Sequence, residues 1–62
     1  MEPKDIIWRV MERLTEQQNL LIDSTRELHP KFNSDLIEAL RECERLTKTQ
    51  INILSRMSKR YQ

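Results

Sequence analysis

Cys43 and His29 carry the side chains of this 62-residue chain that could act as a nucleophile and its base, or as ligands for zinc. The chain has one cysteine and one histidine. Such a pair supplies neither the four ligands of a structural zinc site nor the third, orienting group of a catalytic site. A turn near Pro30 would also separate the two residues by about two helical turns. We therefore predict no catalytic residue, metal, cofactor or small-molecule substrate, and a protein that is not an enzyme.

Five basic residues could form a face that binds nucleic-acid phosphates. These residues are Arg41, Arg45, Lys48, Arg56 and Lys59. Residues 45–62 hold five Lys or Arg and no acid, whereas residues 1–44 hold six Lys or Arg against ten acidic residues. The other interpretation is internal complementarity, because an antiparallel hairpin places this basic end beside the acidic start of the chain. The net charge of +1 and the interleaved Glu38 and Glu42 favour the second interpretation.

The composition points to helical structure. The chain contains no glycine, and 37% of its residues are hydrophobic and 34% charged. The absence of glycine excludes phosphate-binding loops rich in that residue, and the short length excludes two domains, barrels and sheets flanked by helices. A domain of about 60 residues buries only about 60% of its unfolded surface. Because the single cysteine cannot form an internal disulfide, self-association or a partner is the expected source of further burial.

Two prolines mark the helix boundaries. Pro3 suits a first helical turn, whereas Pro30 lacks a backbone donor and pushes the residue before it out of helical angles. The chain is therefore predicted to be all-α, one antiparallel helical hairpin. The predicted ranges are one domain over residues 1–62, with a helix over about 3–28, a loop over 29–33 and a helix over about 34–60.

A coiled-coil-like heptad pattern predicts the seam between the two helices. In the first helix the predicted seam consists of Lys4, Ile7, Met11, Leu14, Gln18, Leu21, Thr25 and Leu28. In the second it consists of Leu36, Leu40, Cys43, Thr47, Gln50, Leu54, Met57 and Tyr61. In this register Gln18 faces Thr47, and the two side chains are expected to share a hydrogen bond. The positions opposite the seam are polar: Arg9, Glu16, Asp23, Glu38, Arg45, Asn52 and Lys59.

Apolar residues also occupy both flanks of this seam, and a stripe of that width is typical of a bundle helix. The predicted partner or dimer interface consists of Ile6, Val10, Leu20, Ala39, Leu46 and Ile53. A second, partly exposed apolar flank consists of Trp8, Ile22, Ile37 and Ile51. We expect two hairpins to dock through the first flank into a four-helix bundle. The alternative is that a different protein covers the same surface.

These patterns favour a small non-enzymatic protein–protein interaction module, such as a regulator, adaptor or assembly factor. Its expected partners are a second copy of itself and another protein. The alternative function is a small nucleic-acid-binding regulator that uses the basic outer face of the second helix. The chain shows no signal peptide, no run of about 18 apolar residues and one unpaired cysteine. We therefore expect a cytoplasmic location and no membrane partner.

Overall fold

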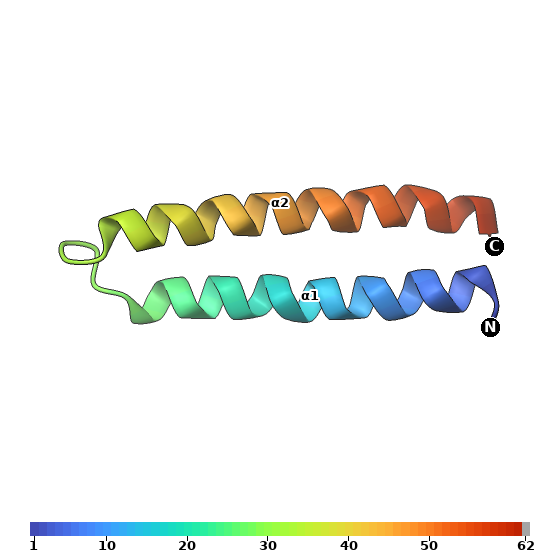
Figure 1. The fold of residues 1–62 in the computed structure, drawn as a ribbon, viewed down its shortest axis with the longest axis horizontal. Coiled ribbons are helices and arrows are strands. Elements are labelled where there is room, and N and C mark those ends of the chain that lie inside the picture. The colour runs from blue at the N-terminus through green and yellow to red at the C-terminus, as the bar shows by residue number, and fades with distance from the viewer. Residues whose placement is uncertain (62) are drawn as a thin grey trace.

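The computed structural model describes residues 1–61, which form two long helices lying side by side. Helix α1 (Pro3–Glu27) runs antiparallel to α2 (Ser34–Ser58), and a short 3₁₀ turn, η1 (Lys59–Tyr61), follows α2 (Figure 1). The hairpin measures 47 × 15 × 11 Å, with both termini at the end opposite the loop. The prediction of an all-helical chain with two packed helices is confirmed, and the helix bounds lie within two residues of the predicted ranges.

Prolines set both ends of α1. Pro3 occupies the first turn, where the amide hydrogens of Asp5 and Ile6 bond to the carbonyl oxygen of Glu2 at 3.0 and 3.3 Å. At the other end, Leu28 has an extended backbone, with ψ of 145°. Pro30 follows two residues later and cannot continue the helix, because its ring replaces the amide hydrogen that an α-helix needs.

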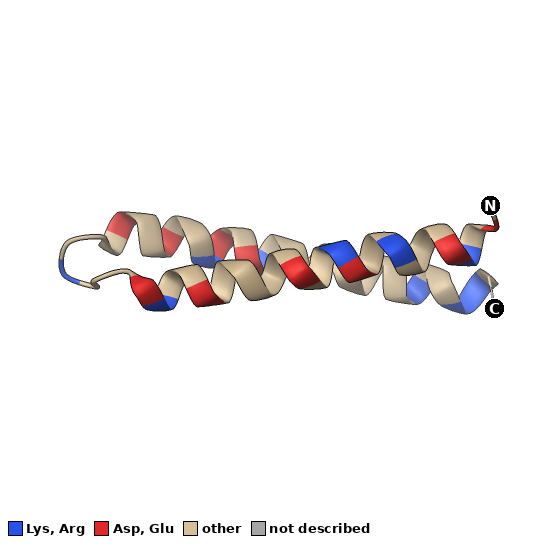
Figure 2. Ribbon diagram, turned by 90° about the horizontal axis from the view of Figure 1, so that it is seen from below, with Lys and Arg blue, Asp and Glu red and all other residues tan. Residues whose placement is uncertain are grey.

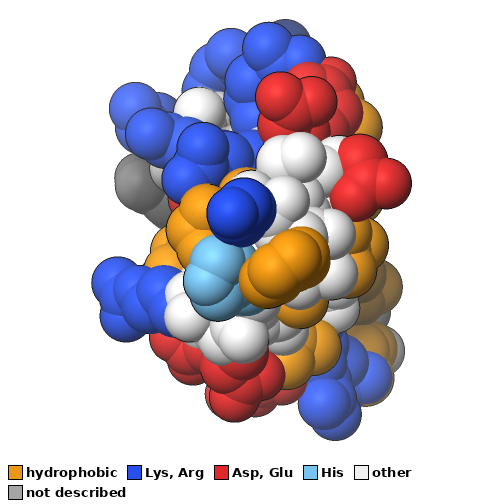
Figure 3. Space-filling model, turned by 90° about the vertical axis from the view of Figure 1, so that its left-hand side faces the viewer, with side chains coloured by type: hydrophobic (Ala, Val, Ile, Leu, Met, Phe, Trp, Pro, Cys, Tyr) orange, Lys and Arg blue, Asp and Glu red, His pale blue; other side chains and the backbone are white. Residues whose placement is uncertain are grey.

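The connection between the helices closes without glycine. The amide hydrogens of Phe32 and Asn33 both bond to the carbonyl oxygen of His29, at 3.2 and 2.9 Å, which forms one right-handed helical turn. His29 Nδ1 accepts a hydrogen bond from the Lys31 amide at 3.1 Å, and its ring lies 4.9 Å from that of Phe32. Figure 3 shows His29 in pale blue on the surface of this end of the hairpin. No described residue has a positive φ. Right-handed turns alone therefore reverse the chain, so the lack of glycine is no obstacle.

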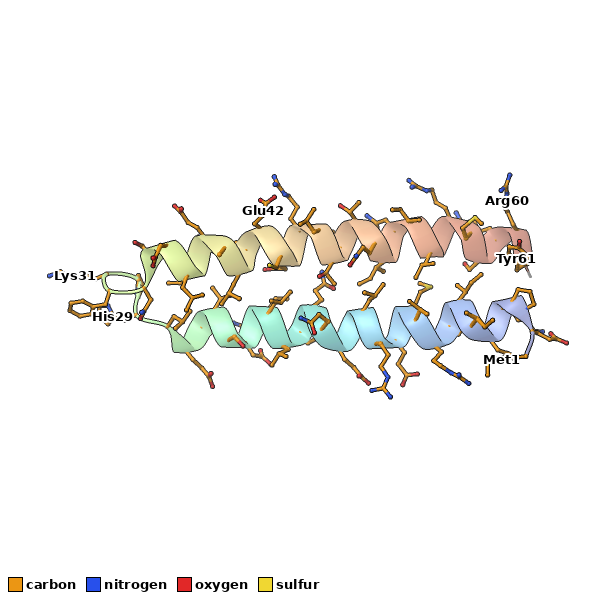
Figure 4. All side chains as sticks on the ribbon, in the orientation of Figure 1. Met1, His29, Lys31, Glu42, Arg60 and Tyr61 are labelled. Atoms are coloured by element: carbon orange, nitrogen blue, oxygen red, sulfur yellow. The ribbon has the colours of Figure 1, made fainter. Side chains whose placement is uncertain are left out.

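The space between the helices holds a thin core. Ile7, Leu21 and Ile37 are its buried apolar residues, and Thr47 is its buried polar residue. Figure 4 shows further side chains in the space between the two helices. The half-buried apolar residues include Met11, Leu14, Leu28, Leu40, Ile51 and Leu54. None of the described side chains is fully enclosed. Two helices alone therefore remove little apolar surface from water.

The predicted seam is right for the first helix except at Lys4, which is exposed, but wrong for half of its positions in the second predicted helix. From Ile7 to Leu28, every predicted seam residue of α1 is buried or half-buried. In the second predicted helix, however, four residues that were predicted to face α1 are exposed: Leu36, Cys43 and Gln50 of α2, and Tyr61 of η1. The residues that do face α1, here called the seam stripe, are Ile37, Leu40, Glu44, Thr47, Ile51, Leu54 and Ser58. Relative to the prediction, α2 is rotated about its axis by about half of one residue's 100° step.

This rotation places two β-branched isoleucines in the seam. Ile37 and Ile51 pack against α1, and in exchange Leu36 and Gln50 turn toward solvent. The expected bond between Gln18 and Thr47 is also absent, because the Thr47 hydroxyl donates to the Cys43 carbonyl oxygen at 2.9 Å within its own helix. A threonine in a helix often makes this bond four residues back, which satisfies the hydroxyl without a partner from the other helix.

Candidate protein interface

An apolar stripe runs the length of α2 beside the seam stripe and faces solvent. This outer stripe consists of Leu36, Ala39, Cys43, Leu46, Gln50, Ile53 and Met57. Its members repeat at steps of three and four, so they share one side of the helix. Six of the seven are apolar, and all are exposed except Met57, which is half-buried. The most exposed of the large ones is Leu46, at 55%.

Helix α1 extends this surface at its exposed Ile6, Val10 and Leu20. The structure brings the two helices together here, because Val10, Leu14, Gln50, Ile53 and Leu54 line one shallow groove. The outer stripe together with Ile6, Val10 and Leu20 is called the apolar face below. All six predicted interface residues are exposed in the hairpin, and three of them, Ala39, Leu46 and Ile53, lie on the outer stripe.

Four residues of the apolar face are not among the predicted interface residues. Leu36, Cys43, Gln50 and Met57 were assigned to the seam, and all of them except the half-buried Met57 are exposed. A signal for them exists in the sequence, since 36, 39, 43, 46, 50, 53 and 57 form an uninterrupted heptad series of their own. That series is easily overlooked because the seam stripe, which repeats just as regularly, occupies the same apolar half of α2.

The total surface shows how incomplete the burial is. The chain exposes 5227 Å², whereas a compact protein of the same mass exposes about 4300 Å². The excess of about 900 Å² reflects the elongated shape of the hairpin, 47 × 15 × 11 Å, and its thin core. Part of the exposed surface is the apolar face, and adjoining exposed apolar side chains of this kind are typical of contact sites.

The second predicted flank does not form one exposed surface. Ile37 is buried, with 7% exposure, and Ile51 is half-buried, because the rotation of α2 turns these two residues into the seam. Ile22 of α1 is also half-buried. Trp8 alone stays largely exposed. It lines a depression along α1 together with Met11, Glu12, Thr15 and Glu16. The surroundings of Trp8 therefore include two carboxylates, unlike the apolar face.

The five basic residues are all exposed, but acidic groups lie among them. Both carboxylate oxygens of Glu42 accept hydrogen bonds from the Arg45 guanidinium, and Figure 4 shows Glu42 on the side of α2 away from α1. Arg41 lines a depression at the loop end that also contains Glu38. Two of the five cations thus have a carboxylate close by, which weakens their attraction for phosphate.

Cys43 and His29 do not form a reactive pair. Cys43 lies on the outer stripe, nine residues and about 14 Å along α2 from its start, whereas His29 lies in the loop (Figure 4). Within residues 1–61, no three His, Cys, Asp or Glu side chains gather where a metal ion could bind. Over the same residues, neither helix has the length and apolarity to cross a membrane. The described surface thus offers one distinctive feature, the apolar face.

Comparison with known proteins adds no assignment, since no family model, curated protein or solved structure matches the chain.

Proposed function

We propose that this protein is a non-enzymatic protein–protein interaction module whose apolar face binds a second copy of the chain, so that two hairpins form a four-helix bundle. The observation that carries the proposal is the composition of α2. The outer stripe has one polar residue in seven, whereas the seam stripe has three, namely Glu44, Thr47 and Ser58. The side of α2 that faces solvent is therefore more apolar than the side packed against α1.

The energetics favour covering this face. Moving one large aliphatic side chain from full exposure to full burial contributes about 1.5–3 kcal/mol. Six such residues lie on the face with 41–59% of their surface still exposed: Ile6, Val10, Leu20, Leu36, Leu46 and Ile53. Covering this remaining half would contribute about 4–9 kcal/mol in total, comparable with the stability of a small domain. A second copy supplies a surface of the same length and chemistry, which is the requirement of an isologous two-fold interface.

The dimer would act as a small regulator, adaptor or assembly factor. Once the apolar face is covered, the charged outer surfaces and Trp8 remain available to another protein. Nucleic-acid binding by Arg41, Arg45, Lys48, Arg56 and Lys59 has less support, because the Arg45 guanidinium is already paired with Glu42. Binding to nucleic acid that weakens steeply with salt would instead favour that alternative function.

Sedimentation equilibrium tests the proposal directly. The native protein should have twice the chain mass of 7.6 kDa at tens of micromolar. Leu46→Glu and Ile53→Glu each place a charge at the centre of the proposed contact and should yield monomers, because a buried unpaired charge is strongly unfavourable. Asn52→Glu is the matched control, since Asn52 is exposed outside the apolar face. A native protein that stays monomeric, or an Asn52→Glu variant that dissociates equally, would contradict the proposal.

A further inference from the structure

We infer that the two copies pack with their loops at opposite ends, so that α2 of one copy lies antiparallel against α2 of the other. This inference rests on the proposed self-association through the apolar face. It goes further by assigning which helix each helix meets and in which direction. The charge distribution along the hairpin and the different outer surfaces of α1 and α2 support it independently.

Two symmetric arrangements would cover the same apolar face. If the two-fold axis runs across the helices, the loops lie at opposite ends and each helix meets its own copy. If the axis runs along the helices, the loops lie together and α1 meets α2 of the other copy. Neighbouring helices are antiparallel in both cases, so helix dipoles favour neither. Both arrangements cover the same apolar face, so side-chain charge and polarity are the features that distinguish them.

The hairpin is acidic toward its loop and basic toward its termini. Residues 19–46, the loop half, carry four basic and six acidic side chains, a net charge of −2. The remaining residues carry seven basic and four acidic side chains, a net charge of +3, which completes the total of +1. Figure 2 shows the contrast along α2, where acidic residues lie near the loop and basic residues near the C-terminus. When the loops lie at opposite ends of the dimer, the acidic loop half of one copy lies beside the basic terminal half of the other.

The individual helices show the same preference. Residues 34–46 of α2 carry a net charge of −2 and residues 47–61 carry +4, whereas α1 carries +1 over residues 3–15 and −2 over residues 16–28. With loops together, residues 47–61 of α2 and η1 (net charge +4) lie beside residues 3–15 of the other copy (+1), and residues 34–46 (−2) lie beside residues 16–28 (−2). Like charges are therefore neighbours in both halves. With loops opposite, each helix places its acidic half beside the basic half of its own copy. Packed helices are 8–10 Å apart, about one Debye length at physiological salt, so these charges interact.

The outer surfaces of α1 and α2 give the second argument. The outer stripe of α2 stays apolar from Leu36 to Met57 apart from Gln50. The corresponding positions of α1 include four polar residues: Arg13, Gln17, Ser24 and Glu27. With loops together, the outer stripe of α2 would lie against Arg13 and Glu27 of the other copy, and an apolar surface offers these charges no polar partner. With loops opposite, the outer stripe meets an equally apolar outer stripe, and the polar positions of α1 face the polar positions of α1 in the other copy.

Distance measurements between the two loops test the arrangement. A nitroxide label on Lys31→Cys, in a Cys43→Ser background, reports the loop position, since Lys31 lies at the loop tip (Figure 4). The hairpin is 47 Å long, so opposite loops should give a label separation of about that length. Loops together should give about 20 Å, a few helix diameters. Sedimentation of the labelled protein shows whether it is still a dimer.

Cross-linking of the native chain provides a second test that needs no substitution. Lys31 and Lys59 lie at opposite ends of the hairpin, so a short amine-reactive reagent cannot join them within one chain. A Lys31–Lys59 cross-link in the dimer band supports opposite loops, and a Lys31–Lys31 cross-link overturns them. A dimer with a short loop-to-loop distance likewise overturns the arrangement but leaves self-association intact. A native protein with monomer mass and no cross-linked dimer overturns the proposed self-association itself.

Discussion

The two stripes of α2 lie side by side on one helix but differ in what they contain. The seam stripe meets α1 and includes Glu44, Thr47 and Ser58, whereas the outer stripe faces solvent and has Gln50 as its one polar residue. In a self-sufficient hairpin the more apolar stripe would face inward, because burial of apolar surface is the main driving force for folding. The reversed order supports the proposal that the hairpin packs against a second copy.

The difference also assigns separate tasks to the two stripes. Polar residues in the seam stripe are tolerated because the interhelical space is narrow and open to water at both sides, so Glu44 stays half-buried. The seam stripe therefore needs to hold the helices in register more than to exclude water. The outer stripe, in contrast, has the composition of a core layer. Substitutions in neighbouring positions of α2 should thus have different consequences.

The largest expected effect separates Ile37 from its neighbour Leu36. Ile37 is 7% exposed and Leu36 is 46% exposed. Ile37→Ala should lower the free energy of unfolding by about 2–4 kcal/mol at every protein concentration, because it opens a cavity in the seam. Leu36→Ala should cost less than about 1 kcal/mol in dilute protein, with a larger loss appearing only where the dimer forms. Urea denaturation over a concentration series measures both.

Concentration dependence is the decisive control for this pair. A loss for Leu36→Ala that is the same at all concentrations would show that Leu36 supports the hairpin itself. An Ile37→Ala loss that disappears on dilution would show that Ile37 acts in the association instead. Either result would contradict the assignment of the seam stripe to the hairpin and of the outer stripe to the dimer contact.

A smaller effect concerns the thiol of Cys43, which is exposed in the hairpin and lies on the outer stripe. In the proposed dimer the partner covers it. The rate of reaction with a thiol reagent should therefore fall at least about tenfold between dilute and concentrated protein, which corresponds to about 1.4 kcal/mol. Lys31→Cys in a Cys43→Ser background serves as the control, since the loop stays exposed. A Cys43 rate independent of concentration would argue against burial of this stripe.

Sequence reasoning works for α1 because that helix has one regular apolar stripe. The steps from Ile7 to Leu28 leave no competing choice of face, and burial follows them. On α2 the predicted seam combined Leu40, Thr47 and Leu54 of the seam stripe with Leu36, Cys43 and Gln50 of the outer stripe. Periodicity defines an apolar sector, but it does not state which edge of a wide sector meets the neighbouring helix. That choice depends on how the side chains pack.

The mistaken seam has a physical meaning in a bundle. Its positions lie between the two stripes, and in a four-helix bundle the middle of a wide apolar sector points toward the bundle axis. The predicted direction therefore suits the proposed assembly better than it suits the hairpin. Trp8 is a different case, because its spacing from Ile22 predicted an exposed apolar flank, whereas Trp8 is the one member of that flank that stays exposed. The position of one aromatic residue contains no periodicity, so the sequence could not show that Trp8 lies apart from the other three.

The smallest expected effect tests whether the polarity of the seam stripe is a cost. Thr47 is 6% exposed, and its hydroxyl bonds to a Cys43 carbonyl oxygen that also accepts the Thr47 amide hydrogen, as in any α-helix. Thr47→Val removes a buried hydroxyl and leaves no carbonyl unpaired, so it should stabilise the protein by about 0.5–1 kcal/mol. The corresponding increase in Tm is about 2–8 °C by calorimetry.

Thr49→Val is the matched control for this last substitution. The Thr49 hydroxyl makes the same kind of bond, to the Arg45 carbonyl oxygen at 3.1 Å, but its side chain is exposed. Its replacement should therefore change the free energy of unfolding by less than about 0.5 kcal/mol. A destabilised Thr47→Val protein would mean that the hydroxyl is needed in the seam, for register or for association. The polarity of the seam stripe would then be a requirement of the fold, and the contrast with the outer stripe would reflect specificity as well as burial.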